Sequence, residues 1–281
     1  MSTLATQDLE QAVAWLDDAD GLLIAAGSGL SVGAGLPDTG DSRRLARALS
    51  VIGKVRPNDQ DLISTLPNAF REAPRAAWGV YGQRLTACRQ SDPHPGYAIL
   101  RRWADATPQG AFVYTSNVDG HFAKAGFAAD RVVEAAGSLH WLQCGKACTP
   151  ELWSADAFNP TIKAEGGLLA GIVPTCPHCG SVARPNVSLA KDWDWVPNRT
   201  MHQHALLSSW LMAMKRLVVV EVGANELAIR RFSEQNGPRV IRIHPTDFAI
   251  SPEVGLGFAA SPLEGLRWLD EHRAPVRKVG T

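Results

Sequence analysis

The sequence has no excess of charge of either sign and no long apolar run. Lysine plus arginine and aspartate plus glutamate number 28 each, so the composition does not indicate a nucleic acid or a membrane surface as a partner. No apolar stretch approaches the ~20 residues that a transmembrane helix needs. The first residues hold no basic segment leading into an apolar one, which predicts no signal peptide and a cytoplasmic location.

Cysteine is scarce, and its spacing favours a metal over disulfides. Of five cysteines, four form two close pairs, Cys144-x3-Cys148 and Cys176-x2-Cys179. Short spacing within each pair and a long loop between the pairs predict a tetrahedral structural zinc site with no open position for catalysis. Four unrelated free thiols are the alternative. Cys88 stands alone and is expected to be an ordinary buried thiol.

Short apolar runs alternate with amphipathic helical patterns along the 281 residues. This alternation predicts an α/β fold with a parallel sheet, and two segments that break the rhythm predict two insertions. One insertion is helical and interrupted by prolines, and the other holds the paired cysteines. The expected strands lie at 22–26, 111–114, 131–134, 217–223 and 240–243.

The stretch 21–41 carries the first candidate binding site. A buried strand over 22–26 is followed by Gly27, Gly29, Gly33 and Gly35. Closely spaced glycines after a strand let backbone N–H groups approach a pyrophosphate with no Cβ in the way. The spacing is close to a dinucleotide-binding fingerprint without matching it fully. The alternative is a tight strand-to-helix turn that binds nothing.

Polar residues also follow the second expected strand, in the run 115–119 with Asn117 and Asp119. The carboxyl ends of parallel strands are where α/β sheets bind ligands, so these side chains are candidate binding groups. The alternative is that both residues cap the next helix.

Several short motifs stand in a fixed order: AGSGLSVGAGLPD, TSNVDGHFAKAG, VVEAAGSLHWLQC, the cysteine pairs and ARPNVSL. In this order the chain resembles the sirtuin (Sir2) family, in particular its bacterial branch, over nearly its whole length. The resemblance implies a Rossmann-type NAD-binding domain, a small zinc module and a cleft where an acylated lysine meets NAD. The family reaction breaks the nicotinamide–ribose bond and moves the acyl group to ADP-ribose. One domain over 1–281 is implied, with a core (1–41, 91–139 and 185–281), a helical insertion (42–90) and a zinc module (140–184).

The resemblance also implies roles for individual residues, with Asn117 and Asp119 as the catalytic pair. Asp38 would lie in the nicotinamide pocket, although an aspartate after a proline can simply start a turn. The residues implied to contact NAD or ADP-ribose are Gly27, Ser28, Gly29, Ser31, Asp38, Asn117, Asp119, Gly223 and His244. The residues implied to hold zinc are Cys144, Cys148, Cys176 and Cys179.

The departures from the family pattern bear on activity. Ala136 stands where sirtuins have the histidine that acts as general base, and a methyl group accepts no proton. Thr39-Gly40 replaces a phenylalanine–arginine pair that closes over NAD, and Ala190-Lys191 replaces a phenylalanine–glycine pair beside the peptide substrate. No other histidine is an evident replacement: His94, His121 and His140 are expected to be structural, and His244 alone is placed at a strand end near NAD.

Two classes of function therefore remain open. The first is an NAD-dependent protein deacylase with weakened or lost activity, or an NAD hydrolase or ADP-ribosyltransferase, because breaking the nicotinamide bond depends mainly on positioning and electrostatics. The second is a sensor of NAD or ADP-ribose, or a scaffold for another protein. The expected partners are NAD or a related nucleotide and an acyl-lysine peptide.

Overall fold

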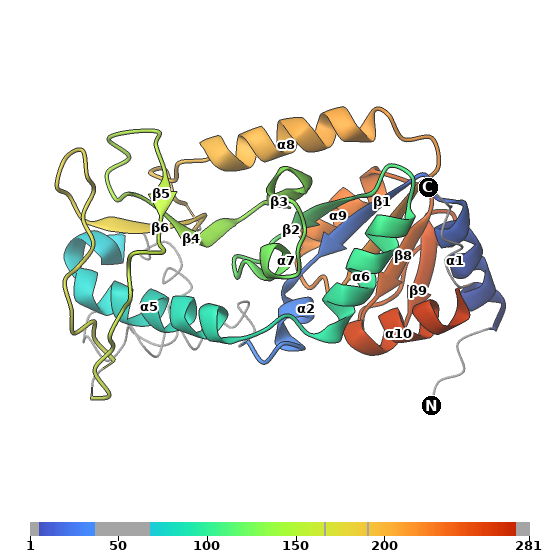
Figure 1. Cartoon of the computed structure of the whole chain (residues 1–281), viewed down its shortest axis with the longest axis horizontal. Helices are drawn as coiled ribbons and strands as arrows, with labels where there is room; N and C mark the ends of the chain where they lie inside the picture. Colours follow the sequence, from blue (N-terminus) through green and yellow to red (C-terminus); the bar gives the residue numbers. More distant parts are fainter. Residues whose placement is uncertain (1–5, 37–67, 166, 190, 274–281) are drawn as a thin grey trace.

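The computed structural model describes residues 6–36, 68–165, 167–189 and 191–273 (Figure 1). Its centre is a parallel sheet of six strands in the order β3-β2-β1-β7-β8-β9. The strands are β1 (Gly21–Ala26), β2 (Ala111–Thr115), β3 (Val132–Glu134), β7 (Leu217–Val222), β8 (Val240–Ile243) and β9 (Gly255–Phe258). The α/β class and the five expected strands are confirmed, and β9 is an addition. The chain builds outward from β1 in one direction and from β7 in the other, so the strand order reverses between these two neighbours.

Strand β1 explains why both faces of the sheet are covered. Leu22 and Ile24 pack in one core cluster and Leu23 in another, on opposite faces, and all three are fully buried. Such a strand needs helices on both sides. The first face carries α1 (Thr6–Asp18), α6 (Pro95–Ala106) and α10 (Pro262–His272); the second carries α8 (Asn198–Leu211) and α9 (Leu227–Gln235) (Figure 1).

A second, smaller body combines a long helix with a three-stranded antiparallel sheet in the order β5-β4-β6. Helix α5 (Pro74–Gln90) begins at Pro74, whose missing N–H is not needed in a first helical turn. Its Trp78 is fully buried and donates an indole hydrogen bond of 2.9 Å to the carbonyl of Ala183. The strands are β4 (Gly137–Cys144), β5 (Trp153–Ser154) and β6 (Ala183–Val187).

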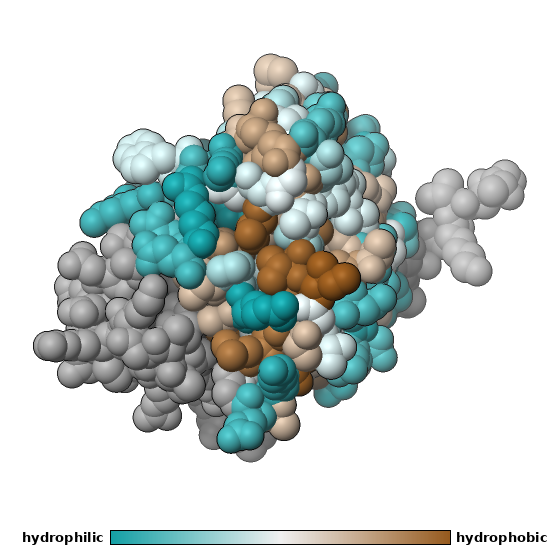
Figure 2. Space-filling view, turned by 90° about the vertical axis from the view of Figure 1, so that its left-hand side faces the viewer, coloured by the Kyte–Doolittle hydropathy of each residue, from teal (hydrophilic) through white to brown (hydrophobic). Residues whose placement is uncertain are grey.

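The helix and the small sheet share one apolar core, to which Val118 and Leu139 also belong. Both residues lie close to the carboxyl end of β2, so this core reaches the edge of the parallel sheet where ligands are expected. The end of the molecule that carries the small sheet shows apolar side chains set among polar ones (Figure 2). Within the described residues, no helix has the length and the apolar character needed to cross a membrane.

Candidate functional site

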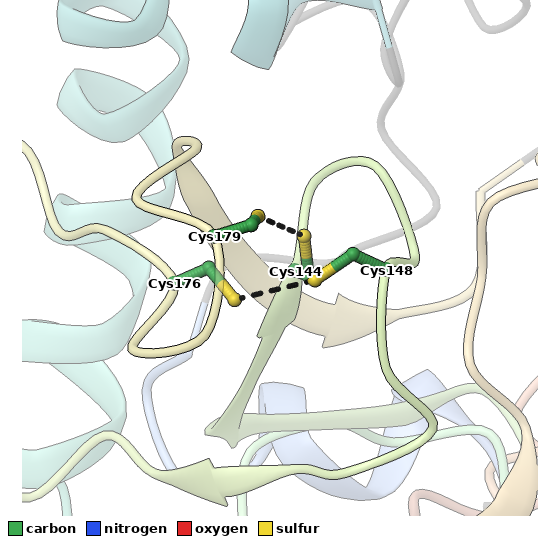
Figure 3. A group of neighbouring side chains, drawn as sticks. All are labelled: Cys144, Cys148, Cys176 and Cys179. Atoms are coloured by element: carbon green, nitrogen blue, oxygen red, sulfur yellow. Dashed lines mark hydrogen bonds between the residues drawn. The ribbon is translucent and has the colours of Figure 1, made fainter.

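Two sites emerge, and the first is the cysteine cluster. The four sulfurs of Cys144, Cys148, Cys176 and Cys179 lie within 4.8 Å of one another. The first two come from the end of β4 and the loop after it, and the other two from the loop that precedes β6 (Figure 3). The Sγ atoms of Cys144 and Cys179 are 3.6 Å apart, and those of Cys148 and Cys176 are 3.7 Å apart. Ligands about 2.3 Å from a tetrahedral zinc stand about 3.8 Å from each other. The cluster therefore fits the predicted structural zinc site.

The backbone around the cluster supports this assignment. The N–H of Lys146 donates to the sulfur of Cys144 over 3.4 Å, as in a knuckle that turns a sulfur toward a metal. Hydrogen bonds from Ser181 lower the pKa of Cys179 to about 6, which favours the thiolate that binds metals. His178 points elsewhere, because its ring pairs with Glu151 at 2.8 Å.

The second site lies where the strand order reverses, at the carboxyl ends of β1 and β7. The N–H of Gly29 donates to the carbonyl of Gly223 over 2.9 Å. A Cβ on Gly27 would lie 2.6 Å from Ala224 Cα, and one on Gly29 would lie 2.9 Å from the Gly223 oxygen. These glycines are needed because the loop after β1, which leads into α2 (Ser28–Val32), touches the loop after β7.

The predicted catalytic pair lies beside this loop, at the end of β2. Asp119 is 5% exposed; it accepts hydrogen bonds from the Ser31 hydroxyl and, at 2.8 Å, from the N–H of His121. Asn117 is equally buried and donates from its amide to the Gly27 carbonyl over 3.0 Å. The structure thus brings together Gly27, Ser31, Asn117 and Asp119, which are 92 residues apart at most by their numbers.

A pocket opens next to this pair, and its space of about 350 Å³ includes the open solvent at its mouth. Its charged lining residues are Asp119 and Arg84, and its apolar wall includes Val118 and Leu139. Cys88 also lines it, and burial together with the nearby Asp119 charge raises the pKa of the Cys88 thiol to about 12. Cys88 therefore stays protonated at neutral pH and is the inert buried thiol that the sequence predicts.

Ala136 packs against the apolar core that contains Val118 and Leu139. Its carbonyl accepts a hydrogen bond of 2.9 Å from the N–H of Ser188, so the backbone here pairs with the continuation of β6. Gly137 follows with a φ of 80°, which favours glycine, and a Cβ there would lie 2.0 Å from the Asn186 oxygen. The backbone turn at Ala136 and Gly137 is thus fixed by its own contacts, while the side chain at position 136 offers no titratable group.

The nearby histidines are occupied by structural contacts. His94 is the N-cap of α6: its Nδ1 accepts from the N–H of Gly96 at 3.0 Å, and its Nε2 donates to the Leu30 carbonyl at 3.0 Å. The ring of His140 bonds to the Asp119 carbonyl at 2.8 Å. His121 is fully buried, and its Nε2 lies 2.9 Å from the Ser91 hydroxyl.

His244 lies at the end of β8, as the sequence predicts, and both of its ring nitrogens are used. Nδ1 accepts from the N–H of Asp247 at 2.8 Å, so the proton is on Nε2, which donates to Asn225 Oδ1 at 2.8 Å. Asn225 in turn donates to the Ser28 hydroxyl over 3.1 Å. Burial lowers the pKa of His244, which keeps the ring neutral at pH 7. His94 and His244 thus use both ring nitrogens. Among the described residues, His121 Nδ1 is buried with no hydrogen-bond partner, and the ring of His140 bonds through Nε2 alone.

Some predicted residues lie outside the described part of the chain: Asp38, Thr39, Gly40 and Ala190. Conversely, Asn225 and Glu226 lie in the site and were not predicted from the sequence. The sequence signal that could have found them is their place in the loop that begins at Gly223, immediately after β7, since loops at strand ends line α/β ligand sites.

The fold and the site define a class: a Rossmann-type α/β protein with a cysteine-rich zinc module and a glycine-lined crevice at the strand ends. The sequence profile of the Sir2 family matches residues 27–204. This chain therefore belongs to the Sir2 family, as the motifs predict.

Similar proteins span most of the chain. It is 25% identical over 268 residues to an NAD-dependent protein deacylase of Thermus thermophilus, covering 93% of each protein. It is 31% identical over 181 residues to an NAD-dependent protein deacylase of Ralstonia nicotianae, covering 63% of this chain and 62% of that protein. It is 30% identical over 222 residues to a probable bifunctional ADP-ribose hydrolase/ADP-ribosyltransferase of Fusarium oxysporum, covering 74% of this chain and 36% of that protein.

Solved structures agree on the fold. A mutant Sir2 homologue in complex with ADP-ribose superposes with a TM-score of 0.69 at 18% identity, covering 94% of this chain and 95% of that one. A Sir2 homologue in complex with NAD gives a TM-score of 0.65 at 20% identity, covering 94% and 93%. The Rossmann-type core and the small module are thus the family architecture.

Proposed function

We propose that this chain binds NAD as a substrate across the carboxyl ends of β1, β2 and β7 and breaks its nicotinamide–ribose bond. The observation that carries the proposal is the buried carboxylate of Asp119, fixed by Ser31 and the His121 N–H beside the glycine loop. The likeness to proteins named as NAD-dependent deacylases and to a structure with NAD supports the choice of nucleotide.

The chemistry follows from charge. As nicotinamide leaves with the electron pair of the broken bond, the ribose carbon becomes positively charged, as in glycosidases. A fixed carboxylate in a partly desolvated pocket stabilises that charge without transferring a proton. We assign this role to Asp119, and we assign to Asn117 the role of holding the ribose or the carboxamide. Neither role needs a base at position 136.

The acceptor that takes the ADP-ribosyl group after nicotinamide leaves determines the product. A general base is typically worth about a hundred- to ten-thousand-fold in rate, and Ala136 cannot supply one. We therefore propose that hydrolysis or ADP-ribosyl transfer exceeds acyl-lysine deacylation in this chain. The acceptor oxygen or nitrogen adds to the ribose carbon and loses its own proton to solvent. The similarity to a protein named as a probable ADP-ribosyltransferase supports this ordering.

The test is nicotinamide release from NAD, measured with and without an acetyl-lysine peptide. Asp119→Asn should lower the release rate by roughly a hundredfold or more while leaving the affinity for ADP-ribose nearly unchanged. Asp130→Asn is the matched control, because Asp130 is exposed on η1 (Ala129–Arg131). Equal rates in Asp119→Asn and the unmodified protein would refute the assignment.

A second candidate is a sensor that binds NAD or ADP-ribose and releases no nicotinamide. The observation that favours it is Ala136, which removes one catalytic group from a site whose glycine loop is intact. Calorimetric binding of NAD together with an absence of released nicotinamide would establish this candidate over the enzyme.

A further inference from the structure

Glu226 points its side chain away from the helix it begins. It is the N-cap residue of α9, yet its carboxylate makes no capping hydrogen bond to that helix. Instead the N–H of Ser28 donates to Glu226 Oε1 over 3.4 Å. A Cβ placed on Gly27 would lie 2.4 Å from Glu226 Oε2. The carboxylate therefore lies directly on the glycine loop.

The second carboxylate oxygen has no compensating partner. Glu226 Oε2 is buried and makes no hydrogen bond with any described residue. Arg230, one turn further along α9, is committed to the Ala224 carbonyl and to Asp247. Burying a carboxylate oxygen without a hydrogen bond costs free energy. The Glu226 side chain would therefore be stabilised by turning to a position where both oxygens are solvated.

The path of the chain after β7 sets this position. Gly223 has a φ of 59°, and a Cβ there would lie 2.4 Å from the N–H nitrogen of Leu30. This close approach brings the loop onto α2. Asn225, next to Glu226, is then held by Ser28 and His244, so the following side chain is directed at Gly27.

We propose that Glu226 takes the place of a phosphate group of the ligand and must turn away for NAD or ADP-ribose to bind. The inference rests on the proposed function and deepens it, because it names the residue that sets how strongly the site takes a pyrophosphate. A carboxylate resembles a phosphate oxygen pair in charge and in accepting from backbone N–H groups. Glu226 thus competes with the pyrophosphate and repels it.

The experiment is calorimetric binding of three probes: ADP-ribose, inorganic pyrophosphate and adenosine. Glu226→Gln keeps the shape and removes the charge, so ADP-ribose and pyrophosphate should bind roughly 5- to 100-fold more tightly, as expected for removal of one like charge at contact distance. Adenosine has no phosphate and should change less than about twofold. The gain should shrink at high salt.

Glu253→Gln is the matched control, because Glu253 is exposed and precedes β9. It therefore lies at the amino end of an edge strand, whereas the site lies at the carboxyl ends of the central strands. It removes the same charge and should leave all three affinities unchanged. Glu226→Ala should raise the affinities for ADP-ribose and pyrophosphate by a factor similar to that of Glu226→Gln. Both variants remove the charge and only alanine removes the side-chain volume, so the comparison separates the charge from any steric effect.

The outcomes separate the inference from the function on which it rests. Nicotinamide release tests the function in the unmodified protein, and the ratio between Glu226→Gln and the unmodified protein tests the inference. Equal or weaker binding of ADP-ribose and pyrophosphate by Glu226→Gln overturns the inference while the function stands. Tighter pyrophosphate binding in a protein that releases no nicotinamide supports the inference and refutes the function. Binding of ADP-ribose by none of the variants overturns both.

Discussion

Replacing Gly223 by alanine should destabilise the protein, because this residue joins the two loops of the site. Its φ of 59° lies in the left-handed region, which costs a residue with a Cβ roughly 1–2 kcal/mol. The new Cβ would also lie 2.4 Å from the Leu30 nitrogen and 2.7 Å from the Gly29 carbonyl carbon. Backbone atoms must shift to relieve this contact, at about 1–3 kcal/mol by analogy with overpacked cores.

The total is about 2–5 kcal/mol, and each 1 kcal/mol shifts the melting temperature by roughly 2–4 °C in domains approaching this size. Thermal denaturation followed by circular dichroism measures the effect. Gly110→Ala is the matched control: its φ is 69°, but the nearest atom to the added Cβ is the Ala104 oxygen at 3.9 Å. It should show the conformational cost alone. If both variants melt at the same temperature, the close approach of the two loops is not the reason for glycine at position 223.

Three further predictions can be checked on the purified protein. Elemental analysis should find about one zinc per chain, and chelation should lower the melting temperature because the metal joins the loop after β4 to the loop before β6; well under one zinc would contradict this. Ala136→His should recover less than about tenfold of peptide deacetylation, since groups that act as a unit are not additive; a fully active variant would show that only the base is missing. Burial lowers the pKa of His94, so the unfolded chain binds more protons near pH 6 and stability is lost as pH falls below about 6.5. His94→Asn, which can still cap α6, should reduce the drop in melting temperature between pH 7 and 5.5, and an unchanged slope would exclude this histidine as a cause.

Local patterns were enough to predict the parallel sheet. Strands such as β1 and β7 are continuous apolar runs, and burial on both faces gives that pattern directly. Strand β9 was missed because it reads Gly-Leu-Gly-Phe, which is typical of a loop. Its glycines are needed for close approach: a Cβ on Gly255 would lie 2.1 Å from the Val240 oxygen, and one on Gly257 would lie 2.2 Å from the Phe248 oxygen.

The site was predictable only where spacing alone determines the chemistry. Four cysteines in two close pairs predict a metal wherever the loops lie, and the structure brings their sulfurs together. The direction of a single side chain depends on long-range contacts instead. The carboxylate of Glu226 meets Gly27, 199 positions earlier by residue number, because Gly223 turns the chain onto α2. No local pattern around Glu226 indicates this contact.

The most direct test of the account is a time course of nicotinamide release from NAD by the unmodified protein and by Asp119→Asn. The carboxylate of Asp119, held by the Ser31 hydroxyl and the His121 N–H, is the group expected to stabilise the developing charge on the ribose. The unmodified protein should release nicotinamide without any peptide, and the rate should be lower by roughly a hundredfold or more in the variant. Release at the same rate from both proteins would contradict it.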